Sequence, residues 1–183
     1  MDVEFKPPFL PLLHKIEAKA SKLPFKDSSY DAVISMDMLE HLPKKEREKA
    51  IFEIIRVGRR KVFIGVPAGK EALEQDKKLD EYYQKRFGKR FLFLEEQINF
   101  GLPEKEEIHD IIERAGIAHQ KELKIKIIGN ENLYLREFLM RGWMTKNFFM
   151  DVFYRKIMLL FIPIMRYFNQ EPFYRQLFFV KIY

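Results

Sequence analysis

The sequence has 183 residues, enough for one domain with a buried core, because chains of this size remove roughly two thirds of their surface from water on folding. Hydrophobic residues make up 47% and charged residues 33%, a composition that excludes an intrinsically disordered chain. The absence of cysteine excludes disulfides, thiolate metal ligands and cysteine redox chemistry, and it favours a cytoplasmic location.

The net charge of +6 is compatible with nucleic acid or an anionic membrane as a partner. Lys and Arg are interspersed with acidic residues along the whole sequence, so we expect no nucleic-acid partner. The longest apolar run, Ile157 to Met165, is shorter than the ~20 residues that a membrane-spanning helix needs. With no signal-peptide pattern at the amino end, the expected location is cytoplasmic, with peripheral membrane contact as an alternative.

The amino end has the pattern of short extended segments. Met1 to Phe5 predicts a strand, and three prolines within residues 7–11 prevent a regular helix behind it. His14 to Ala20 predicts another short strand that ends in a turn. Tyr30 to Met36 is a compact apolar run, typical of a strand buried on both faces.

A strand–helix–strand pattern continues from this run. Pro43 stands where a helix begins, and apolar residues at helical spacing follow up to Gly58, where the helix ends. Lys61 to Val66 is the next buried strand. A strand, a helix and a strand in this order imply a right-handed parallel crossover.

The second half of the chain is richer in helical and aromatic segments. A charged helix and an aromatic stretch form a predicted helical insertion at about residues 69–103. Glu104 to Ala115 predicts an amphipathic helix with Gly116 at its end, and Lys121 to Ile128 alternates as a strand.

Residues 130–172 predict an aromatic helical lid or tail, broken near Pro163, before a last strand at about Tyr174 to Ile182. Its basic and aromatic side chains suit a core or lid helix, but they also suit a membrane surface or a lipid-like acceptor. The whole pattern predicts an α/β fold in a single domain, residues 1–183.

Two neighbouring stretches resemble a known family. They are Glu17 to Phe25, with its Leu-Pro-Phe turn, and Tyr30 to Leu42, which opens on Tyr-Asp and closes on Leu-Glu-His-Leu. Together they resemble the third and fourth strands of class I S-adenosylmethionine-dependent methyltransferases of the type 11 kind. Pro172 to Phe178 is similar to the antiparallel seventh strand of many members. The resemblance implies a Rossmann-like sheet with helical insertions and an antiparallel C-terminal strand.

The resemblance also implies a place for S-adenosylmethionine, at the carboxyl ends of the parallel strands. Asp2 would accept hydrogen bonds from the ribose hydroxyls. Three residues would lie at the adenine edge, and Ser35, Met36 and Asp37 would line the end of the fourth strand, facing the methionine part and the substrate. The implied cofactor-binding residues are therefore Asp2, Lys19, Ala20, Ser21, Ser35 and Met36.

Catalytic and metal candidates are fewer. Asp37 and His41 are the candidate catalytic residues, although a histidine at a helix entry also packs under a sheet. Glu40 reads as structural or solvent-facing. His109 and His119 show no metal-ligand spacing, so we interpret both as surface residues and expect no metal site.

The sequence departs from the family pattern in two ways. The first strand and its Gly-x-Gly turn should precede Asp2, and none of the 8 glycines replaces that turn, so we expect an N-terminally truncated sheet. Lys19 stands where the family usually has an acid, and a cation cannot accept a hydrogen bond from the adenine amino group. A missing central strand would leave either direct pairing of its two neighbours or an unpaired edge, and an exposed edge invites a homodimer or a partner subunit.

Two principal functional hypotheses follow. The chain belongs to a methyltransferase that acts on a small or lipid-linked acceptor, or it is a catalytically inactive, methyltransferase-like interaction module without a complete cofactor pocket. A third hypothesis is a peripheral membrane-binding protein built on the basic aromatic tail. The acceptor itself does not follow from the sequence.

Overall fold

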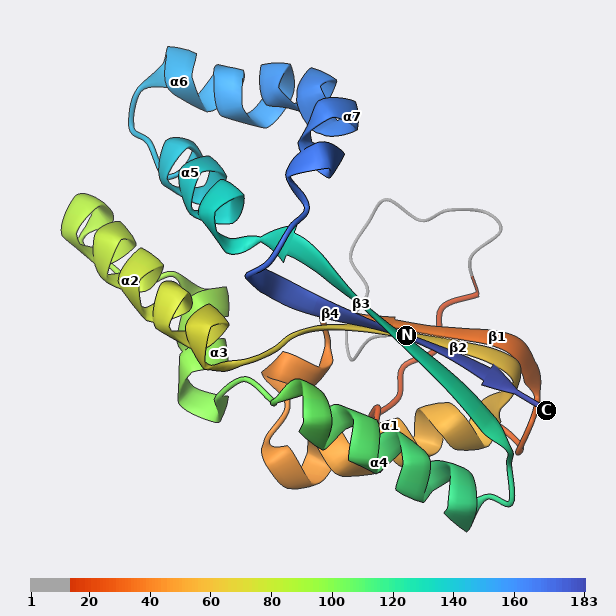
Figure 1. Ribbon diagram of the computed structural model, residues 1–183. Coiled ribbons are helices and arrows are strands. Elements are labelled where there is room, and N and C mark those ends of the chain that lie inside the picture. The colour runs from red at the N-terminus through yellow and green to blue at the C-terminus, as the bar shows by residue number, and fades with distance from the viewer. Residues whose placement is uncertain (1–13) are drawn as a thin grey trace.

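The computed structural model describes residues 14–183, except for the side chain of Arg166. Its centre is a four-stranded sheet in the order β1-β2-β4-β3 (Figure 1). The strands are β1 (Tyr30–Met36), β2 (Gly58–Pro67), β3 (Leu123–Asn132) and β4 (Phe173–Ile182). β1 and β2 are parallel, and β4 runs antiparallel to its neighbours β2 and β3. The predicted α/β fold with an antiparallel C-terminal strand is therefore confirmed.

Two helices, α1 (Lys44–Val57) and α4 (Lys105–Ala118), cover one face of the sheet (Figure 1). α1 begins directly after Pro43. The first backbone N–H groups of a helix have no partner within the helix, so the missing N–H of proline removes no helical hydrogen bond there. Its apolar residues recur at helical spacing and meet those of α4 and the strands in one core. The largest fully buried side chains of this core are Leu39, Ile51, Ile55, Ile64, Ile108, Ile112 and Phe178.

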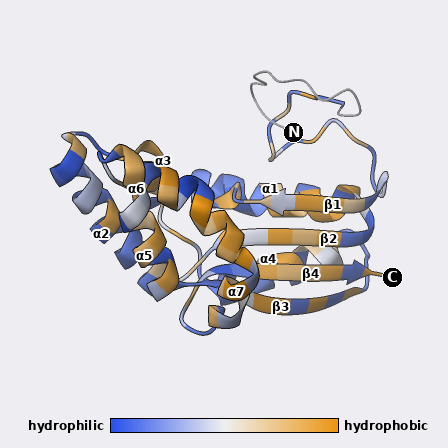
Figure 2. Cartoon of the chain, turned by 90° about the horizontal axis from the view of Figure 1, so that it is seen from above, coloured by the Kyte–Doolittle hydropathy of each residue, from blue (hydrophilic) through white to orange (hydrophobic). Residues whose placement is uncertain are grey.

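The remaining helices lie beyond the carboxyl ends of β1 and β2, and we call them the helical cap (Figures 1 and 2). Gly88 ends the first of them in the left-handed region, at φ +74°, and Asn132 caps α5 by accepting two backbone hydrogen bonds. The helices are α2 (Lys70–Phe87), α3 (Leu92–Phe100), α5 (Leu133–Trp143), α6 (Phe148–Val152) and α7 (Ile162–Met165). Shorter turns are η1 (Leu39–His41), which precedes α1, and η2 (Phe153–Ile157), η3 (Met158–Phe161) and η4 (Arg166–Phe168) in the cap.

The sequence-based boundaries are confirmed for most elements. β1 has the predicted bounds, the helices of the insertion at residues 69–103 are α2 and α3, and the last strand begins one residue early. The helix before β3 extends past Gly116 to Ala118, because Gly116 has no side chain and Leu123 packs directly against it. The predicted strand at Met1 to Phe5 lies outside the described residues.

Two predictions about the first half are wrong. His14 to Ala20 forms no strand, since the described pairing there is an isolated bridge between Lys19 and Lys22. β1 is not buried on both faces, because Tyr30, Ile34 and Met36 are exposed. Within residues 14–183, β1 pairs with β2 along one edge, which leaves its other edge without a strand partner.

Across the part of the chain that the structure describes, no helix combines the length and the apolar character needed to cross a bilayer.

Candidate functional site at the carboxyl ends of the parallel strands

Asp37 occupies the turn directly after β1. Its φ of +49° is an uncommon conformation for a residue with a side chain, and its N–H donates to Gly65 O of β2 at 3.0 Å. Arg175 of β4 donates two hydrogen bonds to its carboxylate, at 2.7 and 2.9 Å, and also pairs with Glu131 of β3 at 3.1 Å. The Asp37 carboxylate is thus fixed by a bidentate arginine two strands away.

The two residues before Asp37 point to opposite sides of β1. Ser35 is buried, and its Oγ has no hydrogen-bond partner within residues 14–183. Met36 is half exposed and lies across Gly65, where an added Cβ would come within 2.4 Å of Met36 Cε. Gly65 therefore makes room for Met36, and the Ser35 hydroxyl is available to a ligand.

Glu40, in η1, is buried to 1% exposure, and neither of its carboxylate oxygens has a hydrogen-bond partner in the described chain. Burial, with a smaller contribution from Asp37, raises its pKa to about 7, against opposing effects of its own backbone N–H and of Arg175 and Arg47. The interpretation of Glu40 as solvent-facing is wrong, because the turn directs its side chain inward. A buried carboxyl that titrates near neutral pH is typical of functional sites.

His41 lies beside Glu40 but is partly exposed and belongs to a different set of contacts. Its Nδ1 lies 2.8 Å from Glu96 Oε2 of α3, and its Nε2 lies 3.9 Å from Glu40 Oε1. The ring also contacts Phe93 edge-on. His41 therefore joins η1 to the cap and keeps Nε2 on the side of Glu40.

A buried polar network joins the sheet to the cap. Arg136 of α5 pairs with Asp76 of α2 at 2.7 Å, and its guanidinium lies 3.4 Å from the centre of the Tyr174 ring. The Tyr174 hydroxyl lies 3.2 Å from Asp76 Oδ2 and 3.1 Å from Gln97 Oε1. Burial raises the pKa of Asp76 to about 6 although Arg136 opposes this. The network fixes α2, α3 and α5 against the start of β4.

The residues expected at the adenine edge have other partners in the structure. Ser21 faces α1 and hydrogen-bonds Glu46, while Ala20 packs against the main core. Lys19 forms an isolated β-bridge with Lys22, and its positive charge helps to lower the pKa of Glu46. Ser21 therefore contacts α1, whereas Asp37 contacts β4. Asp2, the expected ribose ligand, lies outside the described residues.

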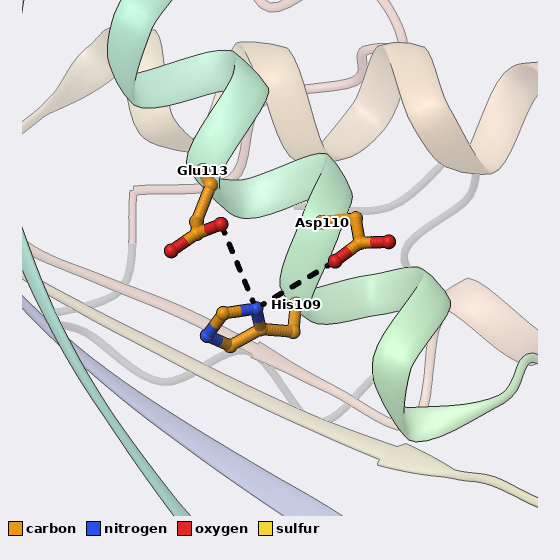
Figure 3. Close-up of side chains that lie close together, drawn as sticks. All are labelled: His109, Asp110 and Glu113. Carbon is orange, nitrogen blue, oxygen red and sulfur yellow. Dashed lines mark ion pairs between the residues drawn. The ribbon is translucent and has the colours of Figure 1, made fainter.

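The sequence-based expectation for His109 overlooked two neighbours on α4. His109 Nδ1 lies 3.8 Å from Asp110 Oδ1 and 3.9 Å from Glu113 Oε2 (Figure 3). The three ligand atoms lie within 4.8 Å of one another, but the two acids are exposed, and exposed acidic groups of this kind are common without a metal ion. His119 is half-buried rather than on the surface, and its ring contacts Phe52.

Sequence reasoning missed Glu40 as a buried group, and it missed Arg175 and the Asp76–Arg136 pair altogether. An acid between Leu39 and His41, in a turn that leads into a buried helix, was the available signal for Glu40. Asp76 and Arg136 are 60 positions apart, so no local pattern joins them.

A cavity of about 720 Å³ lies beside this network, between α2, α5 and the start of β4. Its walls include Gln75, Tyr134 and Gln176. Gln176 pairs in register with Val66 near the carboxyl end of β2, so the cavity opens at the same end of the sheet as Asp37.

A profile of a family described as a methyltransferase domain matches residues 4–64. The match contains both stretches that carry the resemblance, and it covers β1, α1 and most of β2. Over residues 4–64 the chain is therefore similar to a methyltransferase domain. The residues Ser35, Asp37, Glu40 and His41 therefore lie in the methyltransferase segment, whereas Arg175 and the buried network of the cap lie outside the matched residues.

The proteins that match this chain do so over a short segment or at low identity. An uncharacterized protein of Haemophilus influenzae is 49% identical over 45 residues, which are 25% of this chain and 18% of that protein. A Thermotoga maritima SAM-dependent methyltransferase is 14% identical, with a TM-score of 0.48 over 91% of this chain and 62% of that one.

Two further solved structures match this chain with similar identities and TM-scores. A Haemonchus contortus phosphoethanolamine N-methyltransferase, in complex with phosphomonomethylethanolamine and S-adenosylhomocysteine, is 19% identical, with a TM-score of 0.45 over 91% of this chain and 36% of that one. A Haloferax volcanii methyltransferase bound to the Trm112 activator is 16% identical, with a TM-score of 0.46 over 91% and 60%. The chain thus spans about a fifth of the curated relative and under two thirds of these three structures.

Proposed function

We propose that this chain is part of an enzyme that transfers a methyl group from S-adenosylmethionine to a small or lipid-linked acceptor. The observation that carries the proposal is the methyltransferase match over residues 4–64, which includes the end of β1. At that end Ser35, Asp37 and Glu40 gather polar groups, two of them buried. Open α/β sheets bind ligands beyond the carboxyl ends of their parallel strands, which is where these groups lie.

The described residues fit the methionine part of S-adenosylmethionine better than its adenine. The Ser35 hydroxyl has a free hydrogen-bonding capacity and the Asp37 carboxylate is held rigidly, so both suit the polar methionine part. Lys19 does not suit the adenine amino group, because an ammonium group is a donor only. The fit therefore supports the methionine and acceptor side of the site, from residues of β1 and η1.

The reaction asks little covalent chemistry of the protein. S-adenosylmethionine supplies an electrophilic methyl group, so the protein's part is to align an acceptor and to exclude water. Asp37 and His41 are the candidate proton acceptors, and Glu40, whose pKa is about 7, stands 3.9 Å from His41 Nε2. We assign Glu40 a positioning role, since its burial keeps its carboxylate away from solvent and directs it at His41.

An alternative function is favoured by one specific observation. The outer edge of β1 has no strand partner within residues 14–183, and Tyr30, Ile34 and Met36 expose apolar side chains on one face beside it, which suits an interaction module that pairs with another strand. In this alternative the methyltransferase domain binds a partner subunit or a second copy and holds no cofactor by itself.

Titration calorimetry with S-adenosylmethionine and S-adenosylhomocysteine separates the two functions. The enzyme hypothesis predicts micromolar binding of both ligands, and Ser35→Ala should weaken it roughly fivefold, the value of one hydrogen bond of about 1 kcal/mol. Ser35→Ala should not destabilise the fold, because the hydroxyl has no partner in the described chain. Glu122→Gln, an exposed change in the loop before β3, is the matched control and should bind like wild type.

A folded protein that releases no heat with either ligand would contradict the enzyme hypothesis for this chain and leave the interaction module. Circular dichroism at the titration temperature establishes that the protein is folded.

A further inference from the structure

The outer part of the helical cap exposes large apolar side chains instead of burying them. Within α6, η2, η3 and α7, none of the described side chains is buried. Phe149 is 80% exposed and Leu160 77%. We define the cap surface as the exposed side chains Phe148, Phe149, Met150, Phe153, Ile157, Leu159, Leu160, Phe161, Ile162, Ile164, Tyr167 and Phe168. An apolar patch of this extent marks an interaction site in a folded protein.

The charges of the same segment are mainly positive. Lys146 and Lys156 are exposed, and Arg155 pairs with Asp151, the one acid between positions 144 and 170 of the sequence. The sequence adds a further cation at Arg166. Bulky apolar residues beside lysine and arginine are the composition of helices that lie in the interface of an anionic membrane.

The insertion that carries the cap surface is closed at its base by two hydrogen bonds. Asn169 Oδ1 accepts a hydrogen bond from Glu131 N at 2.7 Å, and Asn132 Nδ2 donates to Gln170 O at 2.8 Å. These contacts join the start and the end of the insertion between β3 and β4. In Figure 1, α6 and α7 form the outermost layer of the cap, beyond α5, at the end of the sheet that carries Asp37. Figure 2 shows apolar residues along this helical region.

We propose that the cap surface binds the interfacial layer of a bilayer that contains anionic lipids. The segment is too short to span a bilayer, and Pro163 interrupts it. In this proposal the segment therefore lies along the membrane surface and inserts its apolar side chains into the interface. A second copy of the chain is the competing occupant. A symmetric interface would place the lysines of one copy against those of the other, which disfavours a dimer, whereas anionic headgroups complement them.

Vesicle flotation tests the proposal without reference to methyl transfer. The wild-type protein should float with vesicles of phosphatidylcholine and phosphatidylglycerol in equal parts, and float less with phosphatidylcholine alone. Phe149→Ser combined with Leu160→Ser should abolish flotation. Lys146→Ala combined with Lys156→Ala should weaken binding to the anionic vesicles roughly 30-fold, at about 1 kcal/mol per lysine. This loss should shrink as salt is added.

A matched control and a built-in reporter accompany the flotation. Ile117→Ser removes an equally exposed apolar side chain, at the end of α4 and outside the cap surface, and should float like wild type. Trp143, the single tryptophan, lies 4.8 Å from Arg155 at the base of the cap surface. Its emission should shift to the blue on binding and be quenched by brominated lipid.

A folded protein that stays unbound with anionic vesicles overturns the proposal. So does a dimer in light scattering that Phe149→Ser with Leu160→Ser dissociates, because the second copy then occupies the surface. Neither result bears on cofactor binding, which calorimetry measures separately.

Discussion

At the scale of single residues, Glu40 has the least usual environment in the described chain. Its carboxyl is buried without a hydrogen-bond partner among residues 14–183, and its pKa is raised from 4.5 to about 7. A carboxyl whose folded pKa is raised favours the folded state below the unfolded pKa. That contribution is lost as the pH rises from about 4.5 through 7.

We therefore predict that Glu40→Gln changes the pH dependence of stability. The wild-type protein should lose about 3 kcal/mol of unfolding free energy between pH 5 and pH 8 through this group, and the variant should not. Urea denaturation at the two pH values measures the difference. Glu122→Gln, an exposed control, should follow the wild type. Parallel pH profiles for wild type and Glu40→Gln would show that the Glu40 carboxyl is hydrated.

The candidate site was predictable only in part at this scale. The sequence predicted the place of Ser35, Met36 and Asp37. The apolar run forms β1, and a strand of seven residues fixes where its carboxyl end lies. The alternation of side chains then separates buried Ser35 from exposed Met36. Glu40 was named but misplaced, since a single turn of η1 decides whether its side chain points inward. Arg175 was missed because its partner Asp37 is 138 positions away.

At the scale of elements, the Asp76–Arg136 pair joins α2 to α5. Its side chains are 0% and 5% exposed, so removing Asp76 leaves the buried Arg136 guanidinium with the more distant carboxylate of Glu131, at 3.9 Å. Asp76→Ala should lower the free energy of unfolding by about 3–5 kcal/mol at pH 8, where Asp76, with a pKa of about 6, is ionised. Asp76→Ala combined with Arg136→Met should recover much of that loss.

Urea denaturation of the two variants tests this role. Lys77→Ala removes an exposed pair with Glu74 on the same helix and should change stability by less than about 0.5 kcal/mol. If Asp76→Ala costs no more than Lys77→Ala, the pair does not hold α2 to α5.

Elements with a strong local pattern were predicted well, and those that depend on distant contacts were not. α1 and β2 follow from Pro43, the apolar spacing and Gly58. The packing of α5 against η2 depends on Gly142, whose missing Cβ would lie 2.0 Å from the Tyr154 ring. Nothing local marks Gly142 as a contact point, so the arrangement of the cap did not follow from the sequence.

At the scale of the whole molecule, the described chain presents an apolar edge as well as the cap surface. β1 pairs on one side with β2, and its exposed residues lie beside a cavity of about 1010 Å³ that follows the first half of the strand. The sequence predicted an exposed edge that invites association, but it did not predict that β1 would form it beside such a cavity. Leu23, Phe25 and Tyr30 line the cavity, so an additional strand would meet apolar side chains there.

We predict that this protein self-associates through the β1 edge and that Ile34→Lys removes the association. Ile34 is 69% exposed, so the change should leave the free energy of unfolding within about 0.5 kcal/mol of wild type. A lysine on an edge strand opposes pairing with a further strand. Sedimentation velocity over a range of concentrations should show a self-associating wild type and a monomeric variant.

Ile117→Lys, on α4 away from the edge, should associate like wild type. A wild type that sediments as a monomer at every concentration would contradict the prediction, and loss of association in Phe149→Ser with Leu160→Ser alone would assign it to the cap surface.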